Sequence, residues 1–181
     1  MPRIAAFATC ALACALSAQA AQPPSRAESR NMALVGYSDL QARTAYQPVI
    51  QRQGDRYIAY VGHHGDIKLN PLNGQTENNG TSIVDVTNPR KPVQLAHIPG
   101  ETGKAEQGGA QMVRVCGGDT LPKGVKGKWY MLRVFGNAAH EIWDVTDPAK
   151  PSLLTTVVKD LKGTHKNWWE CDTGMAFLVS G

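Results

Sequence analysis

The stretch HEIWDVTDPAKP, residues 140–151, has a near-copy upstream in TSIVDVTNPRKP, residues 81–92. Asp85 of the first copy corresponds to Asp144 of the second, and the two prolines that follow each aspartate keep the same offset. Each copy joins a short apolar run to a turn with two prolines. A repeated segment at a fixed spacing predicts an array of similar structural modules.

Short runs rich in Val, Ile, Leu and aromatic residues surround both copies, with Gly, Asn, Asp or Pro between them. Their length and composition predict β-strands. No long segment after Ala20 has the apolar period of a helix, so we expect an all-β fold. The runs are residues 46–53, 56–62, 81–87, 92–98, 110–116, 129–136, 140–146, 151–158, 167–172 and 175–181.

Grouped in fours, the runs give two complete modules, about residues 44–100 and 101–162, and a third that has begun, residues 163–181. Four strands enclose too small a core to be stable alone, and stacked modules of four antiparallel strands are the blades of a β-propeller. Two insertions, residues 63–80 and 117–128, are rich in Gly, Asn, Pro and Lys and predict surface loops. A ring needs about four to eight blades, so we expect an incomplete ring and a fragment of a longer protein.

The doubled signature is similar to that of a known family. SIVDVTNPRKP and EIWDVTDPAKP resemble the repeats of the LVIVD-repeat proteins, which are secreted bacterial and archaeal β-propellers. The resemblance covers nearly all of the chain after Ala20, and the segments THKNWWECDTG and GGAQMVRVC are similar to those of one secreted subgroup. It implies a propeller architecture, and for function it suggests only a role in binding at the cell surface.

The acidic residues of the signature have a structural explanation. Asp147 can accept hydrogen bonds from backbone amides of the turn, and Pro148 fixes φ at a turn position. We therefore expect Asp85, Asp144 and Asp147 to stabilise turns, and we assign no catalytic residue.

The segment that ends at Ala20 has one early cation, Arg3, then an uncharged Ala/Leu-rich run and the sequence AQA. This pattern predicts a signal peptide that is cleaved after Ala20, and hence export to the periplasm, the cell surface or the medium. A lipid anchor at Cys14 is the alternative. Residues 21–43 are polar and predict a linker or an N-terminal arm, and no second apolar span follows.

The net charge bears on the kind of binding partner, and the cysteine content bears on disulfide formation. The chain has a formal net charge of +4 and no basic run, which argues against a nucleic-acid partner. Removal of the predicted signal peptide leaves two cysteines, Cys116 and Cys171, which is an even number in an exported chain. A disulfide between them is favoured over two buried thiols, although strands of different blades can be too far apart for a bridge.

The histidines are the candidate functional residues. In an up-and-down blade, His63 and His64 begin a loop between the second and third strands, and His140 closes the matching loop of the next module. His97 and His165 lie at or just after the ends of outer strands. Since loops of these two classes emerge on the same face, we expect all five side chains there.

Imidazoles at the mouth of a propeller can bind a divalent or transition metal or act as acid/base groups. The candidate metal ligands are His63, His64, His140 and His165. The alternative is that these histidines bond backbone carbonyls, because no H-x-H or H-E-x-x-H spacing is present.

Three functions fit this sequence. The leading hypothesis is an exported scaffold that binds a protein or a small-molecule ligand on the face with the histidine-bearing loops. The second is a metal-assisted enzyme, a hydrolase or an oxidoreductase, because propellers often carry active sites in their mouths. The third is a surface adhesion component.

Overall fold

The structure is a computed structural model that describes residues 30–181. The predicted leader, its cleavage site and the alternative anchor at Cys14 lie outside the described residues. Residues 30–181 form thirteen β-strands and no α-helix, and the paired strands are antiparallel. The prediction of an all-β fold with antiparallel strands is therefore confirmed. This part of the chain has no helix long and apolar enough to cross a membrane.

The first large sheet is a meander in which consecutive long strands pair. Its order is β1 (Tyr46–Gln53), β2 (Arg56–Gly65), β5 (Gly80–Asp85) and β6 (Val93–Pro99). A further strand, β7 (Ala105–Ala110), pairs with the last residues of β2. β7 was not predicted, because its sequence AEQGGA has almost no apolar side chains.

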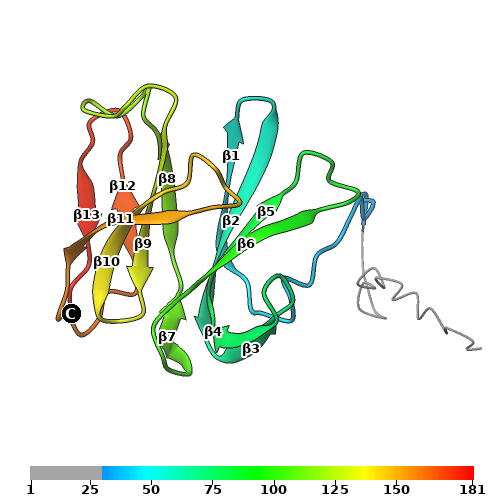
Figure 1. Ribbon diagram of the computed structural model, residues 1–181, viewed down its shortest axis with the longest axis horizontal. Helices are drawn as coiled ribbons and strands as arrows, with labels where there is room; N and C mark the ends of the chain where they lie inside the picture. Colours follow the sequence, from blue (N-terminus) through cyan, green and yellow to red (C-terminus); the bar gives the residue numbers. More distant parts are fainter. Residues whose placement is uncertain (1–29) are drawn as a thin grey trace, which may run out of the picture.

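The second large sheet repeats the same order. β8 (Val113–Gly117), β9 (Trp129–Phe135), β10 (Ala139–Asp144) and β11 (Ser152–Val158) pair one after another. The two sheets lie side by side (Figure 1). The sheets within residues 30–181 close neither a barrel nor a ring.

Two hairpins complete the chain. β12 (Asn167–Trp169) and β13 (Ala176–Leu178) pair beside β8. β3 (Ile67–Asn70) and β4 (Gln75–Asn78) pair within residues 63–80, which were predicted to be a loop. That prediction is wrong for residues 67–78, because the two short strands pair in register as a hairpin, although its apolar side chains Ile67 and Leu69 stay exposed. The other insertion, residues 117–128, has no strand after Gly117.

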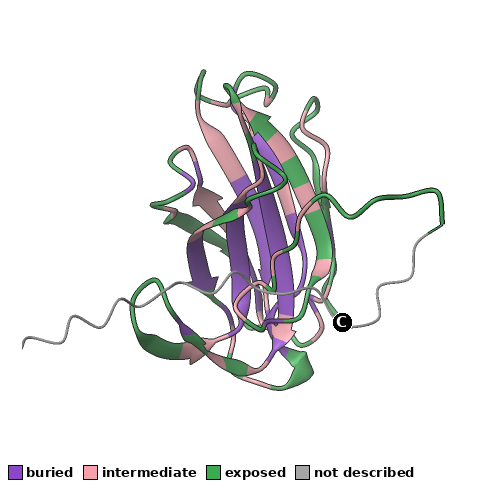
Figure 2. Cartoon of the chain, turned by 90° about the vertical axis from the view of Figure 1, so that its right-hand side faces the viewer, coloured by how far each residue is buried: buried purple, intermediate pink, exposed green. Residues whose placement is uncertain are grey.

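The core lies between the two large sheets. Alternate residues of β2, Ile58 and Tyr60, face the second sheet and are fully buried, because side chains in a strand alternate between its faces. The buried residues are concentrated in the central strands, and the turns are exposed (Figure 2). Leu40, from the segment before β1, packs against Ala59 and Val61 on the opposite face of the first sheet. Buried Ile83, Ala96, Ile98, Val113, Val115, Met131 and Val145 complete the cluster between the sheets.

The signature turns have the same hydrogen bonds in both copies. Asp85 Oδ1 accepts the backbone N–H of Thr87 at 2.8 Å, and Asp144 Oδ1 accepts that of Thr146 at 2.9 Å. Each threonine hydroxyl oxygen accepts a backbone N–H from the start of the second strand, that of Tyr57 or that of Trp129. The expectation that these aspartates stabilise turns is confirmed, and the same bonds in two copies explain why the sequence repeats.

Ion pairs add to these turns. Arg56 lies 3.0 Å from the carboxylate of Asp85, and Lys128 lies 3.0 Å from that of Asp144. Asp147 Oδ1 accepts the N–H of Ala149 at 3.0 Å, as expected for a turn aspartate. The signature residues are thus occupied by local contacts at the end of the sheets where β2 and β9 begin.

Candidate functional site

The histidine pair of β2 lies at the end of the sheet opposite the signature turns. The prediction that His63 and His64 begin a loop is wrong, because β2 continues through both residues and pairs with β7. His140 likewise lies within β10 and not in a loop. Since neighbours in a strand point to opposite faces, His63 is directed into the protein and His64 towards the surface. His63 is fully buried and His64 is about a quarter exposed.

His64 is part of a cluster of chemically active side chains. Its Nε2 lies 3.2 Å from Oε1 of Glu106, and Nδ1 of His165 lies 3.1 Å from Oε2 of the same carboxylate. The two imidazole rings are nearly parallel, with centroids 6.3 Å apart. The ring of Tyr46 packs against both, at 4.8 and 5.9 Å. We call Tyr46, His64, Glu106 and His165 the Glu106 cluster.

The cluster joins four parts of the chain. Tyr46 begins β1, His64 comes from β2, Glu106 from β7, and His165 from the irregular segment between β11 and β12. The backbone of Glu106 is held in place, because its carbonyl oxygen accepts hydrogen bonds from Gln111 Nε2 at 3.2 Å and Asn137 Nδ2 at 3.0 Å. Its side chain is 60% exposed, so a carboxylate on a fixed backbone reaches solvent.

His64 is close to Glu106 without a hydrogen bond to it. The 3.2 Å separation is within ion-pair distance, yet Nε2 of His64 is buried and has no hydrogen-bond partner in the structure. The two groups are therefore within ion-pair distance but are not aligned for a hydrogen bond.

A second polar network is largely buried, with the side chain of Glu77 12% exposed. His97 Nδ1 lies 2.6 Å from Oε1 of Glu77, and Asn70 donates to the same oxygen at 2.7 Å. Arg43 donates to Asn79 Oδ1 at 2.7 Å, and its guanidinium is 3.8 Å from Glu77. The side chains of Arg43 and His97 are completely buried. This network supports the β3–β4 hairpin, and neither Arg43 nor His97 reaches solvent.

His63 belongs to this interior. Its Nδ1 donates to the carbonyl oxygen of Thr44, and its Nε2 lies 2.8 Å from the hydroxyl oxygen of Ser82. Its ring is 5.9 Å from that of His97. Burial lowers the pKa of His63 to about 4, and burial together with the charge of Arg43 lowers the pKa of His97 to about 4. Both imidazoles are neutral in the fold at neutral pH.

These two buried histidines predict a loss of stability in mild acid. An unfolded histidine has a pKa near 6.5, so below that pH the unfolded chain binds protons that the folded chain does not. The contribution is complete above pH 6.5 and is lost as the pH falls towards 4. Between pH 7 and 5 we expect the free energy of unfolding to fall by about 2 kcal/mol for each of His63 and His97, measured by urea denaturation.

A matched variant separates this effect from general acid sensitivity. His97→Gln keeps a hydrogen-bonding side chain that does not titrate, so its stability should depend less steeply on pH than that of the unmodified protein. A slope that is the same in both proteins would contradict the assignment to His97.

His140 makes its hydrogen bond neither to the Glu106 cluster nor to the buried network that contains His63 and His97. Its Nε2 donates to the carbonyl oxygen of Val179, 2.9 Å away. Burial lowers its pKa. Of the four predicted ligands, the structure thus brings His64 and His165 together, and bonds His63 and His140 to other partners. Within residues 30–181, no group of three or more His, Cys, Asp or Glu side chains stands as a ready metal site.

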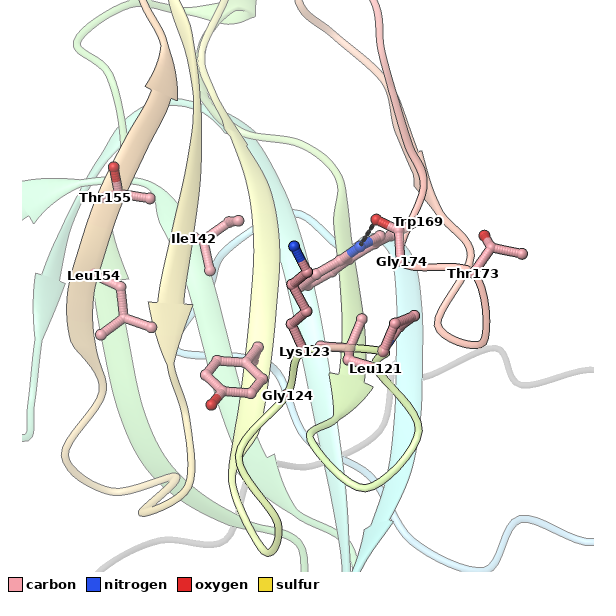
Figure 3. Close-up of a pocket in the computed structure, with 11 residues that line it drawn as sticks. Leu121, Lys123, Gly124, Ile142, Leu154, Thr155, Trp169, Thr173 and Gly174 are labelled. Carbon is pink, nitrogen blue, oxygen red and sulfur yellow. Dashed lines mark hydrogen bonds between the residues drawn. The ribbon is translucent and has the colours of Figure 1, made fainter.

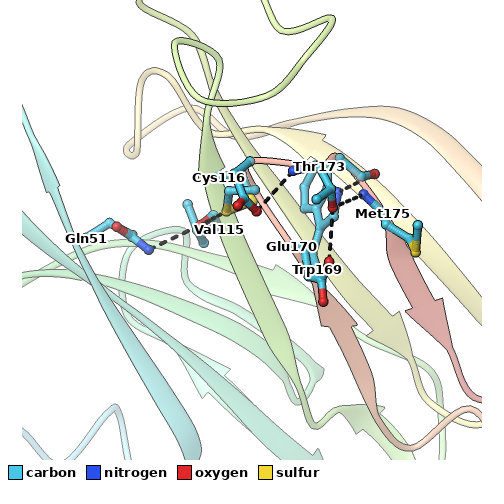
Figure 4. The surroundings of a disulfide bond; sticks show 10 residues. Gln51, Val115, Cys116, Trp169, Glu170, Thr173 and Met175 are labelled. Atoms are coloured by element: carbon cyan, nitrogen blue, oxygen red, sulfur yellow. Dashed lines mark hydrogen bonds between the residues drawn. A yellow bond between two sulfur atoms is a disulfide. The ribbon is translucent and has the colours of Figure 1, made fainter.

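A disulfide joins the second sheet to the last hairpin. Cys116, at the end of β8, is bonded to Cys171, in the turn between β12 and β13, and their Cα atoms are 5.4 Å apart. Figure 4 shows the bridge beside Val115, whose carbonyl oxygen accepts a hydrogen bond from Gln51 of β1 at 3.1 Å. The bridge therefore fixes the hairpin of β12 and β13 beside β8.

An apolar pocket of about 470 Å³ lies next to this hairpin. Ile142 and Leu154 of the second sheet form one wall, and Trp169 forms the other (Figure 3). The indole N–H of Trp169 donates to the carbonyl oxygen of Gly174 at 3.3 Å. The pocket extends along the sheet over Tyr130 and Ile142, and no histidine lines it. Its lining has no acid/base pair.

Comparison of this chain with models of protein families, with curated proteins and with solved structures finds no match.

Proposed function

We propose that this chain is an exported β-propeller protein of the LVIVD-repeat type that acts as a binding scaffold in the cell envelope. In this proposal the two large sheets are successive blades, and β12 and β13 begin the next one. The ligand-binding face is the one that carries the Glu106 cluster.

The arrangement of the first strands supports the blade assignment. β8 contacts β1 on one side and β12 on the other, so the first strands of three successive units are neighbours. In a propeller, the first strand of each blade lies next to the central axis and beside those of the adjacent blades. The identical hydrogen bonds of the two signature turns also support a repeated unit.

The Glu106 cluster is the observation that carries the binding role. Three segments bring two imidazoles and a carboxylate together at a partly exposed place, where Glu106 lies within ion-pair distance of both rings. A few convergent polar groups are a common feature of ligand sites.

Photo-crosslinking in the native cell envelope tests this role. A photoreactive amino acid at Lys166, next to the cluster, should give a discrete crosslinked product. The same amino acid at Asp55, in the turn between β1 and β2 at the opposite end of the sheet, should give none. Equal products from both positions, or none from either, would contradict the proposed binding face.

A further inference from the structure

The second large sheet leaves part of one face open beside the β12–β13 hairpin. We propose that this face is the docking site of two further antiparallel strands that carry the repeat signature and extend the sheet begun by β12 and β13. This inference rests on the blade assignment in the proposed function, and it adds the partner that the second sheet binds. We call this surface the open face; its residues line the apolar pocket of Figure 3 and are Tyr130, Ile142, Leu154 and Thr155.

The residues of the open face have equivalents in the first large sheet. When Asp85 is aligned with Asp144, the strand pairings of the two sheets match, and so do the irregularities in the pairing of the outermost strands. In this alignment Tyr130 takes the place of Ile58, Ile142 that of Ile83, Leu154 that of Leu95 and Thr155 that of Ala96. The open face is therefore equivalent to the face through which the first sheet packs against the second.

The two equivalent faces differ in burial. On the first sheet Ile58 and Ile83 are fully buried and Ala96 is 8% exposed, because the second sheet covers them. On the second sheet Leu154 is 51% exposed, and Thr155 is exposed as well. Removal of apolar surface from water stabilises a contact, so an apolar face that is open here and covered at its equivalent fits a covering sheet of the same kind.

The interface between the two large sheets defines the chemistry of the partner. Val145 is fully buried in it, and Trp143 packs against the same cluster. These two signature residues are two positions apart, so they point to the same face of the strand. The first copy of the signature has Val84 and Val86 at these positions, which are also apolar. A strand pair with this signature therefore presents an apolar pair suited to the open face.

The strand β13 offers backbone groups to the same partner. Among the described strands β13 pairs only with β12, so its other edge carries no ladder of hydrogen bonds. An exposed strand edge is a template for pairing with another strand. The partner can thus continue the sheet from β13 and cover Ile142 and Leu154 at the same time, as β10 and β11 continue the sheet from β9.

A small apolar molecule is the other candidate for this space. Such a ligand needs polar groups to orient it, but the hydroxyl of Tyr130 already accepts the N–H of Val125 at 3.3 Å. The match between the open face and a face that a sheet covers in the same protein favours the strand pair.

An extension of the full chain tests the docking site. A copy of residues 137–158, which include β10 and β11, is added after Gly181, since this segment follows β9 in the second sheet. We expect the extension to lower the equilibrium constant for unfolding at least tenfold, measured by urea denaturation, because it buries large apolar side chains. The same extension with its copies of Trp143 and Val145 changed to serine is the matched control and should give no such gain.

Substitution in the open face should abolish the gain. Leu154→Arg in the extended chain is expected to remove it, whereas Leu153→Arg should keep it. Leu153 is the matched position, because it is 48% exposed in the same strand and is not among the residues that line the pocket. In the extended chain the backbone amides of β13 should also exchange their hydrogens more slowly than in the unmodified protein.

Three results would overturn the docking site. They are an equal gain from the serine control, a gain that survives Leu154→Arg, and dimers of the unmodified chain that Leu154→Arg dissociates, since a second copy would then be the occupant. The crosslinking test concerns the Glu106 cluster and this test concerns the open face, so failure of one proposal is recognised separately from failure of the other.

Discussion

Removal of the disulfide by Cys116→Ser together with Cys171→Ser should lower the free energy of unfolding by about 4 kcal/mol. The cysteines are 55 residues apart, and a bridge across a segment of this length strongly restricts the unfolded chain. The hairpin that it holds has little burial of its own, since Trp168 and Phe177 are both 52% exposed. Urea denaturation of the oxidised protein and of the double variant measures the difference.

The same change should release the last hairpin before the sheets unfold. Limited proteolysis of the double variant is expected to cut first between His165 and Gly181, because β12 and β13 form only a short ladder of their own. A reducing agent should weaken the unmodified protein and have no effect on the variant, which controls for other effects of the reagent. Equal unfolding midpoints for the oxidised protein and the variant would contradict this role of the bridge.

The strands were predictable because their side chains alternate and turn residues separate them. Ile58 and Tyr60 face the core between the sheets, and Ala59 and Val61 face the other way, as the period of a strand requires. The repeated aspartates were also predictable, since their hydrogen bonds are local and depend on a few neighbouring residues. The sequential order of strands in both large sheets was expected from grouping the runs in fours as modules of antiparallel strands.

The candidate site was predictable only in part, because it depends on contacts between distant segments. Histidine content pointed to His64 and His165, but Glu106 stands in a glycine-rich stretch that is typical of a loop. It enters the cluster because β7 pairs with the end of β2, and that pairing uses Gly109 and Ala110 where no apolar pattern marks a strand. No signal in the sequence distinguishes the buried His63 from its exposed neighbour other than the alternation along β2.

The burial of the charged Arg133 was not predicted either, because it also depends on contacts between distant segments. Arg133 lies in the middle of β9 with 1% of its surface exposed, and its Nε donates to Glu141 Oε2 at 2.9 Å. The guanidinium also donates to the carbonyl oxygens of Ile98 and Pro99, at 3.2 and 2.9 Å, and lies 4.8 Å from the ring centre of Trp143. Burial lowers the pKa of Arg133, and the carboxylate of Glu141 opposes that shift.

Arg133→Met should therefore destabilise the protein by about 3 to 5 kcal/mol, because it leaves the carboxylate of Glu141 buried without its cation. Trp143 Nε1 still donates to that carboxylate at 2.8 Å, but a single neutral donor does not replace a charge. Arg114→Met is the matched control. Arg114 is partly exposed, donates a hydrogen bond to the carbonyl oxygen of its neighbour and lies 4.7 Å from the ring centre of Trp168, so its loss should cost only about 1 kcal/mol.

The double variant Arg133→Met with Glu141→Met identifies the cause of the loss. If the cost comes from an unpaired buried carboxylate, removing both charges should restore most of the stability, since apolar side chains of similar volume often replace a buried pair at little cost. Urea denaturation of the two single variants and the double variant gives the coupling energy between the two positions. If the double variant is as unstable as the sum of the single ones, the charges act independently. The contacts of Arg133 with Ile98 and Pro99, which join the two large sheets, would then account for its effect.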